Sequence, residues 1–97
     1  MSPQDDTVAV DRLRRALPAF QAAQNSLLGA HRRLKALPQA EVDAFWRGQG
    51  RRLEASMRAT ATEVAAAFKQ FSAAGLVAGA PDRHLVTQAQ RYLAEGA

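Results

Sequence analysis

The feature of this sequence that most constrains its fold is an apolar stripe that keeps helical phase from Val42 to Phe71. At about 100° per residue its members fall within about 80° of one another, which is the periodicity of a helix and not of a strand. They are Val42, Trp46, Leu53, Met57, Thr60, Val64, Phe68 and Phe71. A second row has the spacing of a heptad seam: Leu13, Leu17, Phe20, Gln24, Leu27, His31 and Leu34. The two rows predict an all-α protein, an antiparallel helical hairpin of two long helices plus a short C-terminal helix.

Helix breakers place the expected ends of these helices. With 97 residues the chain supports one core, so we expect a single helical domain spanning 1–97. Proline disfavours helix for the residue before it and suits a first helical turn, so the bend is expected at Pro38. Gly75 is a typical C-cap, and Asp82 can cap the last helix. The expected helices therefore cover about 7–37, 38–74 and 82–95.

Gly48 and Gly50 interrupt the second expected helix, and Pro18 lies inside the first. The apolar stripe keeps its phase on both sides of the two glycines, which favours one continuous helix from 38 to 74. Pro18 lies away from the heptad row, where it either kinks the first helix or starts a new one.

Composition and spacing argue against catalysis and against a cofactor. The chain has no cysteine, and its 47% hydrophobic content includes few aromatic residues, which suits close helix packing better than a ligand cavity. His31 and His84 lack the spacing of a metal site, and Glu41 and Asp43 point to different sides of a helix. Ser26 has no histidine placed to activate it. We expect no catalytic residue, no cofactor, no metal and no small-molecule substrate.

The N-terminal sequence and the hydropathy pattern bear on location. Residues 1–6 lack the basic and apolar regions of a signal peptide, and no run reaches the roughly 18 apolar residues of a membrane span. A cytoplasmic location without a membrane span is the expectation.

Basic residues exceed acidic ones by 13 to 9, a net charge of +4, and most of them are arginines. Arginine pairs bidentately with carboxylates and phosphates, so acidic proteins and nucleic acids are both compatible partners. A GC-rich bacterial genome would produce the same bias. A bend at Pro38 gathers most of the arginines of the central region at one pole: Arg32, Arg33, Arg47, Arg51, Arg52 and Arg58. No aromatic residue is interleaved in sequence for base stacking, which disfavours single-stranded nucleic acid.

Trp46, Arg47 and Gly48 form a W-x-G tripeptide near the middle of the chain. Together with the chain length and the stretch 59–64, it resembles the WXG family of small leaderless helical hairpins exported by type VII secretion. The resemblance implies a bend at the tripeptide and secretion without a signal peptide. The phase of the apolar stripe instead implies a straight helix there, with Trp46 as an ordinary core residue.

A second resemblance involves residues 73–77 followed by Pro81, Asp82 and Arg83. This segment is similar to the exit of a recognition helix into the wing of winged-helix DNA-binding regulators. The resemblance implies a helix in the major groove and a wing on the DNA backbone.

We expect a non-catalytic protein that acts by helix–helix association with a protein partner, as a homodimer or a hetero-complex, because a two-helix hairpin has more apolar seam than it can bury alone. Gln24 and His31 would set the register of that seam. The expected partner-binding residues are Leu13, Leu17, Phe20, Leu27, Trp46, Leu53, Met57, Phe68 and Phe71. The alternative is a basic accessory factor that binds DNA or RNA through the arginine-rich pole, which a strong dependence on salt would distinguish.

Overall fold

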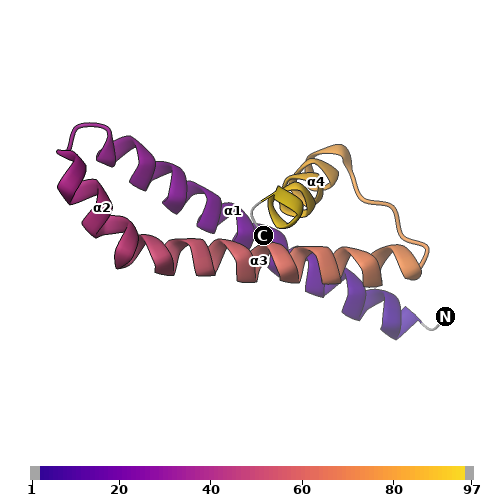
Figure 1. Cartoon of the computed structure of the whole chain (residues 1–97). Helices are drawn as coiled ribbons and strands as arrows, with labels where there is room; N and C mark the ends of the chain where they lie inside the picture. The colour runs from indigo at the N-terminus through magenta and orange to yellow at the C-terminus, as the bar shows by residue number, and fades with distance from the viewer. Residues whose placement is uncertain (1–2, 96–97) are drawn as a thin grey trace.

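The structure is a computed structural model that describes residues 3–95, and within that range it contains four helices and no strand. They are α1 (Pro3–Leu34), α2 (Gln39–Arg47), α3 (Gln49–Ala73) and α4 (Ala80–Glu95). The prediction of an all-α protein is confirmed. Figure 1 shows α1 running to a turn, α2 and α3 leading the chain back beside it, and α4 lying across this pair. The molecule is elongated, 56 × 22 × 20 Å.

The core lies where α1, α3 and α4 meet. Phe20 of α1 and Val64 of α3 are the largest fully buried side chains. Alanines at positions 16, 61, 67 and 89 are buried beside them, and their small side chains let the helices approach closely. The remaining larger members of this cluster are Leu13, Leu17, Met57, Phe71 and Val86. Both apolar rows of the sequence therefore contribute to one internal core.

Gly48 separates α2 from α3, so the prediction of one continuous helix from 38 to 74 is wrong. Its backbone has φ −114° and ψ −95°, which is not helical. The amide of Gly48 donates to the carbonyl of Phe45, and the amide of Arg51 donates to the carbonyl of Gly48, both at 3.1 Å. Since α3 starts at the very next residue, the stripe keeps its phase and the sequence pattern cannot reveal the break.

The first helix begins earlier and ends earlier than predicted, at Pro3 and Leu34 instead of 7 and 37. It is continuous through Pro18, which is exposed. The chain then leaves helical geometry at 35–38, and the carbonyl of Pro38 accepts the amides of Glu41 and Val42 in the first turn of α2. The bend expected at Pro38 is therefore confirmed.

Gly75 ends α3 with a left-handed conformation, φ +79°, that favours glycine. The amide of Gly75 donates to Ser72, and that of Leu76 to Phe71, which satisfies carbonyls at the helix end as predicted for a C-cap. Residues 76–79 then lead without regular secondary structure to α4, which starts at Ala80 and not at 82. Within residues 3–95 no strand follows α3, so the described residues lack the wing that the winged-helix resemblance implies.

Candidate binding surfaces

Most of the predicted partner-binding residues lie inside the chain's own core. Five of them belong to the buried cluster: Leu13, Leu17, Phe20, Met57 and Phe71. Leu27 and Phe68 are partly buried and pack against it. Trp46 and Leu53 are half-buried. Less apolar surface of α1 and α3 is available to a partner than their periodicity predicted. The reason is that α4 covers part of the surface that a two-helix pair alone would expose.

The two polar positions of the heptad row also have partners inside the chain. Gln24 donates through Nε2 to Oε1 of Gln88 on α4 at 3.0 Å, and Nε2 of Gln88 lies 3.1 Å from Nε2 of His84. His31 lies against Trp46, with ring centroids 4.8 Å apart. Gln24 therefore links α1 to α4. The two histidines have different neighbours, because His31 contacts Trp46 and His84 contacts Gln88.

The basic residues of the central region surround one end of the molecule, which we call the distal end: residues 28–53, comprising the last turns of α1, the turn, α2 and the first turn of α3 (Figure 1). The distal end has six basic residues against two acidic ones, and the rest of the chain has seven of each. The whole net charge of +4 is therefore located there. The basic residues are Arg32, Arg33, Lys35, Arg47, Arg51 and Arg52.

All six of these basic side chains are exposed. None of them forms an ion pair with another residue in 3–95. The predicted pole also included Arg58, which lies outside the distal end. Arg58 is exposed on α3, and near it in sequence Tyr92 of α4 donates its hydroxyl to the carbonyl of Glu54 at 3.4 Å. The structure brings five of the six predicted arginines together.

A small apolar junction lies beneath the arginines of the distal end. Ala30 and Leu34 of α1 are buried there, and so is Gly50 of α3. The Trp46 ring contacts His31 and makes an edge contact with Phe45, with centroids 5.1 Å apart. A Cβ built on Gly50 would be only 2.3 Å from Cε3 of Trp46, so the ring lies directly on the α3 backbone. Trp46 thus has a structural role, and Gly50, four residues later, is the glycine that accommodates it.

Apolar side chains also reach the surface of the distal end. Leu28 is 53% exposed and Leu37 is 44% exposed. Val42 and Phe45 are half-buried, and α2 contains no buried residue. The distal end therefore combines exposed cations with apolar and aromatic surface, which sequence reasoning missed because it considered the arginines and the apolar stripe separately.

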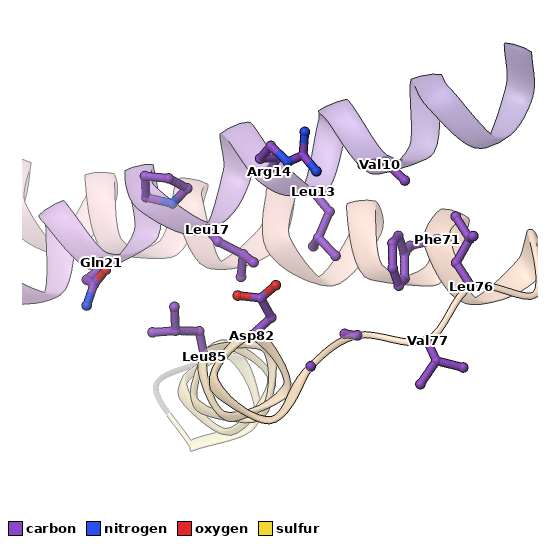
Figure 2. A pocket seen from close by; sticks show the side chains of 13 residues that line it. Val10, Leu13, Arg14, Leu17, Gln21, Phe71, Leu76, Val77, Asp82 and Leu85 are labelled. Atoms are coloured by element: carbon purple, nitrogen blue, oxygen red, sulfur yellow. The ribbon is translucent and has the colours of Figure 1, made fainter.

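A second surface is a groove of about 520 Å³ between α1, the connection 74–79 and α4 (Figure 2). Its floor and walls are mainly apolar: Val10, Leu13, Leu17, Pro18, Phe71, Leu76, Val77, Ala78 and Leu85. Arg14 and Gln21 line it from α1, and Asp82 lines it from the first turn of α4. Val77 is 86% exposed on the connection. A mainly aliphatic composition therefore does not exclude a concave surface in this fold.

An ion pair joins α1 to α3 on another face. Nε of Arg12 lies 2.8 Å from Oε2 of Glu63, Nη2 lies 2.8 Å from Oε1, and Nη1 donates to Gln70. The hydrogen bond from Arg12 lowers the pKa of the Glu63 carboxyl, and the same contact raises the pKa of Arg12. Both side chains are substantially exposed, so the pair orients the two helices and adds little stability.

The described residues hold no group of three or more histidine, cysteine, aspartate or glutamate side chains that could bind a metal ion. Within 3–95 no helix is both long and apolar enough to span a bilayer. No family model, no curated protein and no solved structure matches this chain, so its function must be argued from the two surfaces themselves.

Proposed function

We propose that this is a non-catalytic helical binding protein whose distal end docks an acidic protein partner. Its scaffold is an antiparallel hairpin of α1 with α2 and α3, which α4 braces on one side. The observation that carries the proposal is the charge distribution: the distal end holds the entire net charge of +4, on exposed side chains that have no ion-pair partners in residues 3–95. An acidic surface would supply those partners.

The shape of the molecule supports a role in association. Its accessible surface is 6438 Å², whereas a compact protein of this mass exposes about 5,400 Å². Its radius of gyration is 16.1 Å, against about 12.5 Å for a compact domain of this length. The excess surface is of the size that a protein interface covers, about 800 Å² per partner.

The apolar surface at the distal end favours a protein over a nucleic acid. Leu28, Leu37 and Phe45 lie among the arginines, and protein interfaces combine apolar or aromatic centres with arginine. Stacking of successive bases would need several free aromatic faces, but the Trp46 ring contacts both His31 and the backbone at Gly50, which leaves only the half-buried Phe45 among the tryptophan, tyrosine and phenylalanine residues of 28–53. Binding of DNA or RNA is the second candidate, and the arginines alone support it.

The resemblance to the WXG family remains part of this proposal. It rests on the tripeptide Trp46, Arg47 and Gly48, and the helix break at Gly48 directly follows the first two of these residues. The reversal of the chain lies earlier, at 35–38. Export by a type VII system would be tested by expressing the chain in a host that carries such a system, with Trp46→Ala as the comparison.

The docking proposal is tested with a defined probe: a fluorescein-labelled amphipathic peptide with leucines on one face and glutamates on both flanks. Binding is followed by fluorescence anisotropy. We expect the double variant Arg47→Glu, Arg51→Glu to weaken binding at least about 10-fold, because two interfacial charges become repulsive. The matched control is Arg83→Glu, Arg91→Glu, which makes the same change in net charge on exposed positions of α4 and should leave the affinity unchanged.

A labelled DNA duplex and a labelled single strand are titrated in parallel at low and moderate salt. Protein docking predicts that the peptide binds more tightly than either nucleic acid and loses less of its affinity than they do as salt rises, because part of its interface is apolar. Tighter binding of a nucleic acid with a steep salt dependence would replace the proposal with its alternative. Equal weakening by both double variants would show that only overall charge matters and would refute the distal end as the site.

A further inference from the structure

We infer that the groove between α1 and α4 is a self-association surface, in which the connection 74–79 and the first turn of α4 from a second copy of this chain lie. This inference is independent of the proposed function, because the groove lies outside the distal end. It rests on three features of the groove: a protruding apolar residue, opposite charges on its two walls, and its position in the electrically balanced part of the molecule.

The protruding residue is Val77. At 86% it is far more exposed than Val8, Leu28 or Leu37, the other exposed large hydrophobic residues in the described range. Figure 2 shows Val77 on the connection that forms one wall of the groove, with its side chain turned outward. A knob and an apolar socket thus lie side by side on one surface. In a two-fold dimer such a surface is self-complementary, because each copy offers its knob to the socket of the other.

The two walls of the groove have opposite charges. Arg14 lies on the α1 wall and Asp82 on the α4 wall, and neither side chain forms an ion pair or hydrogen bond with another residue in 3–95. When the wall of a second copy enters the groove, its Asp82 lies beside the α1 wall and therefore near Arg14. The symmetry of the dimer repeats this contact on the other side. The unpaired Arg14 and Asp82 of each copy would therefore pair with Asp82 and Arg14 of the other copy.

The charge distribution also favours self-association through the groove over self-association through the distal end. Two distal ends would bring together two clusters of net charge +4, whereas outside the distal end seven basic residues balance seven acidic ones. A dimer formed through the groove leaves both distal ends free, so it would bind a repeated acidic partner bivalently.

The inference is tested by sedimentation equilibrium at about 100 μM, a concentration at which a micromolar dimer is nearly complete. The wild-type chain should have twice the mass of its 10.5 kDa monomer. Val77→Asp should weaken the dimer at least about 10-fold, because it places a charge in an apolar groove. Val8→Asp is the matched control, since Val8 is also exposed but does not line the groove. Circular dichroism checks that both variants keep the helical content of the wild type.

Charge reversal gives a second readout. Arg14→Asp alone puts two aspartates at each contact, and Asp82→Arg alone puts two arginines there, so each variant should be largely monomeric. An equimolar mixture of the two should dimerise again, because every contact then pairs an arginine with an aspartate. A monomeric wild type would overturn the inference. So would a dimer that resists Val77→Asp, or a mixture that associates no better than its components.

Discussion

Replacing Gly50 with alanine tests whether the Trp46 ring is held on the backbone of α3. The new Cβ would lie 2.3 Å from Cε3 of Trp46 and 3.0 Å from Cδ2, so the ring must move. Its movement is restricted, because the ring also contacts His31 and Phe45. Overpacking of this kind costs about 1–3 kcal/mol, while the gain in helix propensity is at most about 1 kcal/mol. We expect a net loss of about 1–2 kcal/mol in the free energy of unfolding.

Urea unfolding, followed by circular dichroism and by the emission of the single tryptophan, measures this loss. Gly29→Ala is the matched control: its Cβ would be 3.6 Å from Nη1 of Arg33, an ordinary contact, so it should stabilise α1 by about 0.5–1 kcal/mol. In a Trp46→Ala background, Gly50→Ala should also become stabilising, because the ring that it displaces is gone. If Gly50→Ala in the wild type stabilises the protein as much as Gly29→Ala does, the contact between Trp46 and Gly50 is refuted.

Three further substitutions test other parts of the structure. Met57→Asp should cost about 3 kcal/mol or more and abolish the cooperative thermal transition in circular dichroism, because it buries an unpaired charge in the core. Glu63→Gln should lower the urea midpoint slightly near neutral pH. Since Arg12 lowers the pKa of Glu63, that contribution is present above the pKa of the unfolded chain and is lost as pH falls through the folded pKa, so the two midpoints should converge in acid. Gln88→Ala should cost about 0.5–1.5 kcal/mol in urea unfolding, because it removes the hydrogen bond to Gln24 that links α4 to α1.

Periodicity predicted the helical class and pointed to several of the larger buried side chains, because burial in a helix repeats at the spacing that the sequence displays. Leu13, Phe20, Met57 and Val64 all lie inward as their phase requires. The break at Gly48 could not be found in this way, since a one-residue interruption leaves the phase nearly unchanged.

The binding surfaces were less predictable, because they depend on how α4 folds over the other helices. Covering by α4 takes Leu17 and Gln24 out of the free seam and builds one wall of the groove, and no periodic pattern in α1 reports that. Five of the six arginines that the sequence placed at one pole lie within residues 28–53, on either side of the turn that Pro38 marks. Their apolar neighbours depend on the angle between α2 and α3, which Gly48 determines.

The central claim is that the distal end is the surface through which this protein binds an acidic partner. A titration of isotope-labelled protein with the glutamate-flanked peptide, followed by amide chemical shifts in two-dimensional NMR, tests it residue by residue. We expect shift changes concentrated in residues 28–53, with the indole resonance of Trp46 among them, and little change along α4. Shift changes concentrated instead on α4 and the groove, or spread evenly over the arginines of the whole chain, would contradict it.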